Sequence, residues 1–68
     1  MNMSREELIE RATELKIKTI KMHTPNANTN YSTWYHFFSS REWSNKRLKE
    51  FIAREEERHN RYLQVLTQ

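Results

Sequence analysis

The sequence predicts a small all-α protein folded as a single domain over residues 1–68. Glycine is absent and proline occurs once, so the tight turns of a sheet would lack the residues that suit them. Two Ser-x-x-Glu capping boxes and apolar residues at helical spacing indicate helices instead. We expect helices at about 5–22, 31–38 and 40–66, with an asparagine-rich loop after the first.

The first helix is expected to begin after Ser4. Ser4 and Glu7 form a capping box, in which each side chain bonds the backbone amide of the other residue. Ile17 and Ile20 would form a second apolar strip that is available to another chain. The main apolar face of this helix gathers Leu8, Ala12, Leu15, Thr19 and Met22.

The segment that follows Leu15 has a second interpretation. Lysines alternate there with Leu15, Ile17 and Thr19, and alternation is the pattern of a half-buried strand. A strand over 16–22 would pair with 31–38 in a hairpin and would make the fold α+β. We favour the helix because no further strand is available, and an isolated two-stranded ribbon is marginally stable in water.

A loop is expected over residues 23–30. Pro25 disfavours helix at the preceding residue, and the asparagines that follow tolerate left-handed backbone.

An aromatic segment follows the loop, with six of the eight aromatic residues between Tyr31 and Trp43. Four of them match the helical spacing i, i+3, i+4, i+7, and we expect three or four of the six rings to be buried. Ser39 and Glu42 form the second capping box. Phe38 before that cap and Trp43 after it are expected to form a hydrophobic staple that fixes the angle between two helices.

The last helix carries more apolar surface than the first helix can cover. At 1.5 Å per residue, its roughly 27 residues would span about 40 Å, and the first helix would reach about two-thirds of that. We therefore expect part of its apolar stripe to pair with a second copy in a homodimer. The predicted dimer interface consists of Leu48, Ile52, Glu55, His59, Tyr62 and Leu66.

Few residues suggest metal binding or catalysis. Glu55 and His59 lie inside the apolar stripe, where we expect them to bond each other or a partner chain and to set the helix register. Glu56 and His59 have the Glu-x-x-His spacing of di-iron bundles, which need several more carboxylates. His23 and His36 lack the short-range spacing of a zinc site, and no serine has the context of a catalytic triad. We expect no metal, no cofactor and no enzyme activity.

The positive charge is concentrated in the middle of the chain. The net charge is −2 over residues 1–15, +6 over 16–49 and −1 over 50–68. Trp, Tyr and Arg are the usual anchors of protein interfaces, so we expect a small non-enzymatic regulatory or inhibitory protein that binds another protein. The alternative is a nucleic-acid-binding regulator whose rings stack on bases while its cations bind phosphates. Both functions would use Trp34, Tyr35, Arg41, Trp43, Lys46 and Arg47.

Nothing in the sequence indicates a membrane partner. No apolar run approaches the roughly 20 residues that cross a bilayer, and the first residues lack the hydrophobic region of a signal peptide. We therefore expect a cytoplasmic protein. There is no cysteine to form a disulfide, and a chain this short buries only about 60% of its unfolded surface. Both facts favour stabilisation by a partner chain.

Overall fold

The fold consists of three helices, seen in a computed structural model that describes residues 3–67. α1 spans Arg5–His23, α2 spans Tyr31–Ser39 and α3 spans Asn45–Thr67. The described residues contain no strand, so the all-α prediction is confirmed and the α+β alternative with a hairpin of 16–22 and 31–38 is wrong.

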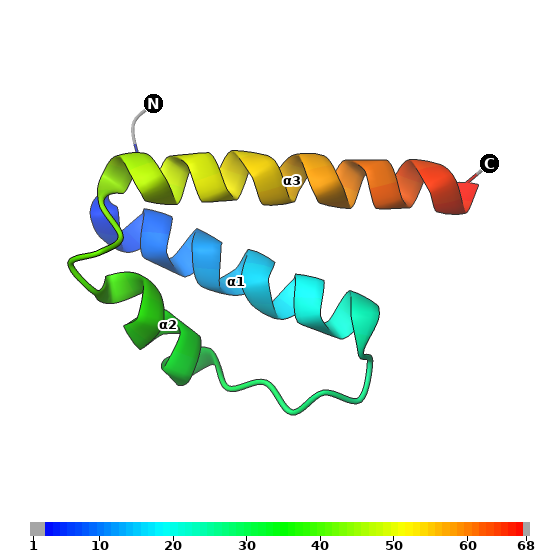
Figure 1. Cartoon of the computed structure of the whole chain (residues 1–68), viewed down its shortest axis with the longest axis horizontal. Helices are drawn as coiled ribbons and strands as arrows, with labels where there is room; N and C mark the ends of the chain where they lie inside the picture. Colours follow the sequence, from blue (N-terminus) through cyan, green and yellow to red (C-terminus); the bar gives the residue numbers. More distant parts are fainter. Residues whose placement is uncertain (1–2, 68) are drawn as a thin grey trace.

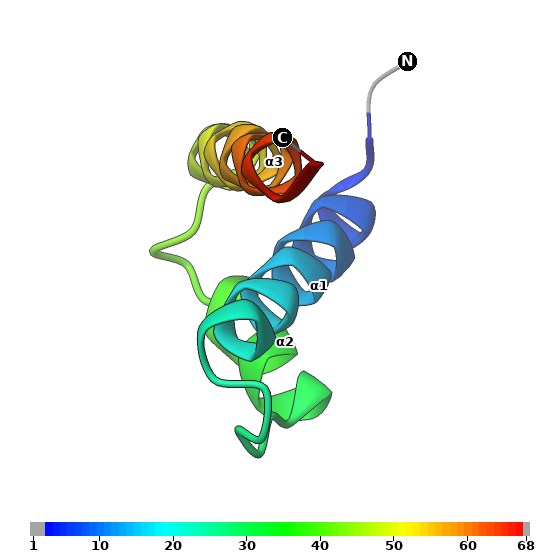
Figure 2. The same cartoon turned by 90° about the vertical axis from the view of Figure 1, so that its right-hand side faces the viewer.

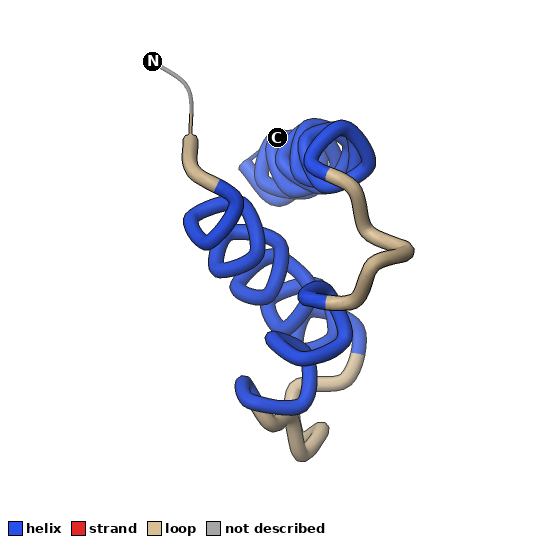
Figure 3. Tube along the Cα trace, turned by 90° about the vertical axis from the view of Figure 1, so that its left-hand side faces the viewer, coloured by secondary structure: helices blue, strands red, loops and turns tan. Residues whose placement is uncertain are grey.

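α1 lies between the other two helices and packs against both (Figures 1 and 2). α2 runs back along one side of α1, and α3 then runs along the other side in the same direction as α1 (Figure 1). The two connections, residues 24–30 and 40–44, lie at opposite ends of α1 (Figures 1 and 3). α1 and α3 diverge toward their C-terminal ends, and α3 extends past the end of α1 (Figure 1).

The predicted start of α1 is confirmed. The Glu7 amide donates to Ser4 Oγ and the Ser4 amide donates to Glu7 Oε1, both over 3.1 Å. Lys21 and His23 lie in the last turn, where cations suit the negative end of the helix dipole. α1 buries a broad face because two helices cover it: Leu8, Ile9, Ala12, Thr13 and Leu15.

α2 begins one residue after Asn30, whose side chain accepts a hydrogen bond of 3.3 Å from the Thr33 amide. This cap is the role that the structure gives to the last asparagine of the loop. No residue of the described chain has the left-handed backbone that the loop asparagines would tolerate.

The predicted second capping box, Ser39 with Glu42, is wrong. Ser39 is the last residue of α2, and its hydroxyl donates to the Tyr35 carbonyl over 2.7 Å. Ser44 caps α3 instead, since the Arg47 amide donates to Ser44 Oγ over 3.2 Å. α3 therefore begins at Asn45 rather than at about residue 40.

A tertiary contact from α1 accompanies the later start of α3. The Arg5 guanidinium donates to the Trp43 carbonyl (2.8 Å), the Ser40 carbonyl (3.2 Å) and Asn45 Oδ1 (3.0 Å). These bonds stabilise residues 40–44 as a non-helical connection across the start of α1. The contact between Phe38 and Trp43 is nevertheless present, with ring centroids 5.0 Å apart.

The core lies where the three helices meet. Phe38 of α2 is 1% exposed, and it is the one fully buried ring among the six from Tyr31 to Trp43; Trp34, Tyr35 and Trp43 are half-buried around the core. Burying a large apolar side chain contributes about 1.5–3 kcal/mol. The buried apolar residues are Leu8, Ile9, Ala12, Leu15, Phe38, Leu48 and Ile52.

A buried polar network joins α1 to α3 beyond this core. Thr19 Oγ1 donates to Glu55 Oε2 over 2.8 Å and lies 3.0 Å from His59 Nε2. The hydroxyl has one hydrogen, which it gives to Glu55, so the Nε2–H of His59 donates to Oγ1. Glu55 and His59 were expected to bond each other or a partner chain, and instead they meet at a threonine of the same chain.

Candidate protein-binding surface

Five aromatic rings from α2, α3 and the connection between them form one packed cluster. Phe38 is its buried centre, with ring centroids 5.0 Å from Trp43, 5.1 Å from Phe37, 5.1 Å from Phe51 and 6.4 Å from Trp34. Several of these pairs are edge-to-face, which is a favoured geometry for aromatic rings. The core of this small fold therefore continues directly into an aromatic surface.

Phe37 is the ring that this cluster exposes to solvent. Its side chain is 49% exposed, although it contacts Trp34 (5.4 Å, edge-to-face) and Trp43 (5.9 Å). Position 37 lies off the face of α2 that carries Tyr31 and Phe38, so it cannot turn toward α1. Three neighbouring rings, Trp34, Phe38 and Trp43, contact Phe37.

Two cations lie over the half-buried tryptophans beside Phe37. The guanidinium carbon of Arg47 is 4.7 Å from the ring centroid of Trp43, and Lys16 Nζ is 5.2 Å from that of Trp34. Contacts of this kind contribute about 0.5–1 kcal/mol at exposed sites. Arg47 Nη1 also donates to the Glu42 carbonyl over 2.6 Å, so its guanidinium is positioned as well as charged.

The structure brings together part of the set predicted from the sequence. Trp34 and Trp43 contact Phe37, and Arg47 stacks on Trp43. Arg41 and Lys46 are exposed and make no ring contact in the described chain. Tyr35 lies apart from this group. Its ring is paired with Tyr31, 6.1 Å away.

Sequence reasoning missed Phe37. The information was present, because Phe37 is the aromatic residue that falls outside the spacing shared by the residues Tyr31, Trp34, Tyr35 and Phe38. A ring outside the apolar face of an amphipathic helix is a better candidate for contact with a partner than a ring within that face. We name Phe37 with Trp34, Trp43 and Arg47 the Phe37 surface.

A notch of about 130 Å³ extends this surface along α3. The half-buried rings of Trp43 and Phe51 line it together with the exposed side chains of Arg47, Glu50 and Arg54. An apolar wall with charged groups at its rim can bind an apolar side chain and an ionic group at once.

Four of the six residues predicted for a dimer interface are buried inside one chain. Leu48, Ile52, Glu55 and His59 face α1 and are less than a tenth exposed. α1 covers them because it runs in the same direction as α3 (Figure 1). The other two, Tyr62 and Leu66, lie near the end of α3 and are exposed.

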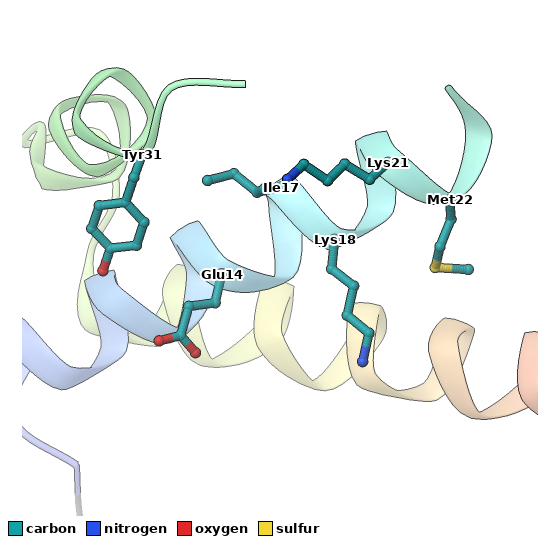
Figure 4. Close-up of a pocket in the computed structure, with 6 residues that line it drawn as sticks. All are labelled: Glu14, Ile17, Lys18, Lys21, Met22 and Tyr31. Carbon is teal, nitrogen blue, oxygen red and sulfur yellow. The ribbon is translucent and has the colours of Figure 1, made fainter. Parts of the chain in front are cut away.

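A second concavity lies on the outer face of α1, where a shallow groove encloses about 490 Å³. Tyr31 borders it from the start of α2, and the other lining side chains come from α1 (Figure 4). Ile17, which the sequence placed on a second apolar strip, is among them. The lining residues are Glu14, Ile17, Lys18, Lys21, Met22 and Tyr31.

The surroundings of Tyr31 also raise the pKa of its phenol. Partial desolvation raises the pKa of its phenol above the ordinary value, and the nearby carboxylates of Glu10 and Glu14 add to the effect, as does Tyr35. A negative phenolate is disfavoured where water is reduced and other negative charges are near.

Residues 3–67 show no group of three or more side chains placed to hold a metal ion. None of the described helices combines the length and the apolar character that crossing a bilayer requires.

Comparisons with known proteins do not extend this description. No protein-family model, no curated protein and no solved structure matches the chain.

Proposed function

We propose that this chain is a small non-enzymatic regulatory or inhibitory protein of the cytoplasm, and that it binds another protein through the Phe37 surface. The observation that carries the proposal is a large ring, about half exposed, on top of a packed aromatic cluster. Interface hot spots are enriched in Trp, Tyr and Arg near the centre of a desolvated patch. The Phe37 surface offers a phenylalanine in contact with two tryptophans, one of which carries an arginine over its ring.

Rigidity supports the same proposal. Binding is weakened by every flexible side chain that must be ordered, at roughly 0.5–1.5 kcal/mol each. Phe37 contacts both Trp34 and Trp43 before any partner arrives, and Arg47 contacts the Trp43 ring and the Glu42 carbonyl. Most of that ordering is therefore complete in the free protein.

A matched pair of alanine substitutions tests the proposal. Phe37 and Tyr31 are exposed to the same degree, 49% and 45%, but only Phe37 belongs to the surface. Cross-linked partners are recovered from the source cell, and their affinity for each variant is measured by calorimetry. We expect Phe37→Ala to weaken binding about tenfold or more, and Tyr31→Ala to leave it nearly unchanged. Equal affinities for both variants would refute the Phe37 surface as the binding site.

A nucleic-acid-binding regulator remains a second candidate because of the unpaired cations near Phe37. Arg41, Lys46 and Lys49 form no ion pair with a carboxylate within residues 3–67. Binding through several such cations should weaken steeply as salt rises. If labelled nucleic-acid duplexes and single strands both fail to bind the protein at low salt, the nucleic-acid-binding function is excluded. If Lys46→Glu with Arg47→Glu leaves every interaction unchanged, neither function uses this region.

We further propose that the chain forms a homodimer through the end of α3, where Tyr62, Leu63 and Leu66 are exposed. Residues 54–66 contain three arginines and three glutamates, so two copies can approach there without net repulsion. Sedimentation at tens of micromolar should show a dimer that Leu66→Glu converts to a monomer. A monomeric wild-type protein at that concentration would exclude the dimer.

A further inference from the structure

α3 carries a second row of side chains at the spacing of a helix–helix contact. The first row of α3 follows positions 48, 52, 55, 59, 62 and 66, of which the first four are buried, with steps of four and three residues as in a heptad seam. One position earlier, 47, 51, 54, 58, 61 and 65 repeat the same steps. We name this second row the arginine seam, since it consists of Arg47, Phe51, Arg54, Arg58, Arg61 and Val65.

The arginine seam faces solvent along most of α3. Phe51 is half-buried and the other five residues are exposed, Val65 by 71%. At 1.5 Å per residue, the four arginines from 47 to 61 lie along about 21 Å of the helix. The two adjacent rows therefore differ in their surroundings. α1 packs against the first row as far as His59, whereas no helix of the described chain packs over the arginines of the second, of which Arg47 alone stacks on a ring, that of Trp43.

The charges of the arginine seam are only partly neutralised within the chain. Arg61 pairs with Glu57 (2.6 Å) and Arg58 pairs with Glu55 (3.6 Å). Both contacts lie within one helix and leave the arginine side chains 76% and 56% exposed. Arg47 and Arg54 form no ion pair with a carboxylate of the described chain.

From this arrangement we infer that the arginine seam docks an acidic amphipathic helix of the partner protein. The inference rests on the proposed function, and it extends the Phe37 surface along α3 through the shared Arg47. A helix lying beside α3 returns a side chain to the contact every three or four residues, at the steps of the seam. Carboxylates at those positions can accept two parallel hydrogen bonds from each guanidinium.

The apolar members of the seam favour a protein helix as the occupant. The notch between Trp43 and Phe51 fits an apolar side chain beside the carboxylates that bind Arg47 and Arg54, and Val65 offers a second apolar contact at the far end.

The flanking charges argue against a nucleic-acid strand. Glu50 lies at the rim of the notch and Glu57 beside Arg61. Both carboxylates would repel a line of phosphates, whereas a helix can place lysines opposite them.

Two synthetic peptides of equal composition test the inference against the whole protein. Each is an alanine-based helix of about 21 residues with glutamates and one leucine. In the first peptide these residues follow steps of three and four along one face, and in the second they are distributed around the helix. By fluorescence anisotropy we expect the first peptide to bind about tenfold more tightly.

Matched double variants assign the binding to the arginine seam. Arg54→Gln with Arg61→Gln removes two seam charges at exposed positions, and Lys18→Gln with Lys21→Gln removes two charges from the outer face of α1. Circular dichroism confirms that each variant stays folded. We expect the first double variant to weaken binding of the patterned peptide about tenfold, and the second to change it less than about twofold.

Several outcomes would overturn the inference. Equal binding of the two peptides, or equal losses in the two double variants, would mean that net charge alone is recognised. A labelled DNA duplex that binds more tightly than the patterned peptide, and loses that binding in the seam variant, would identify nucleic acid as the occupant.

Binding measurements with the natural partner distinguish the arginine-seam inference from the proposed function. If Arg54→Gln with Arg61→Gln binds that partner normally while Phe37→Ala does not, the seam inference is wrong and the proposed function stands. If the patterned peptide needs the seam but Phe37→Ala binds the partner normally, the Phe37 surface is wrong and the seam stands.

Discussion

The two ends of α3 have similar side chains and opposite surroundings. At the N-terminal end Leu48 and Ile52 are buried among Leu8, Leu15 and Phe38. At the C-terminal end Leu63 and Leu66 are exposed by 54% and 62%. The difference lies in what packs against them. α1 ends at His23 and diverges from α3, so it covers α3 as far as His59 and does not reach the last turns (Figure 1).

This contrast divides the molecule into a closed end and an open end. The closed end contains the core, the aromatic cluster and the bonds from Arg5 to the connection before α3. The Thr19 network with Glu55 and His59 lies at the boundary between the closed end and the open end. Beyond it the apolar side chains of α3 are exposed to solvent. Stability should therefore reside at the closed end, and contacts with other molecules can use both.

The largest expected effect on stability comes from removing the buried ring at the closed end. Phe38→Ala removes the buried centre of the aromatic cluster, and such truncations cost about 3–5 kcal/mol. In a domain of this size that is a large share of the total stability. Leu66→Ala, at the open end, should change the free energy of unfolding of the monomer by less than about 0.5 kcal/mol. Urea unfolding at low protein concentration compares the two, and similar losses would contradict the division.

A smaller effect is expected at the boundary. Thr19→Val keeps the shape of the side chain but removes the hydroxyl that both Glu55 and His59 use. Glu55 keeps its ion pair with Arg58, so the main cost is that of leaving the buried His59 Nε2 without its partner, about 1–3 kcal/mol. Thr19→Ser keeps the hydroxyl and should lose much less. If Thr19→Val and Thr19→Ser unfold at the same urea concentration, the network contributes nothing to stability.

Arg5 should have a smaller effect still, because its guanidinium is only partly buried. Arg5→Gln removes its bonds to the Ser40 and Trp43 carbonyls and should destabilise the protein by about 1 kcal/mol. Hydrogen exchange should also rise at the first amides of α3. Arg41→Gln is the matched control, since Arg41 is exposed and makes no such bonds in the described chain. Unchanged exchange in the Arg5 variant would exclude its role in positioning α3.

The sequence predicted the helices well where the determining contacts are local. The start of α1 depends on Ser4 and Glu7, which are three residues apart, and both lie where the pattern placed them. The start of α3 combines a local cap at Ser44 with bonds from Arg5 to the connection before it, and Arg5 is some 35 to 40 residues away in the chain. A local capping pattern at Ser39 could not reveal that contact, so the prediction there failed.

The candidate site was predictable to a similar extent. The pattern of rings and cations named Trp34, Trp43 and Arg47, which do lie together. The predicted dimer stripe included Leu48, Ile52, Glu55 and His59, which the parallel alignment of α1 with α3 buries. That alignment follows from how the two helices are connected through α2, and periodicity within one helix does not specify it.

The smallest expected effect concerns Tyr31, whose phenol has a raised pKa because of partial desolvation first, and of Glu10 and Glu14 second. Since the folded state favours the neutral phenol, its contribution to stability is fully present below the ordinary pKa of about 10 and is lost as pH rises through the raised value. Absorbance at high pH, compared between the wild type and Tyr31→Phe, isolates this titration. Glu14→Gln should lower the Tyr31 pKa only in part, because desolvation remains. A return to the ordinary value would mean that the carboxylate, and not partial burial beside α1, controls this ring.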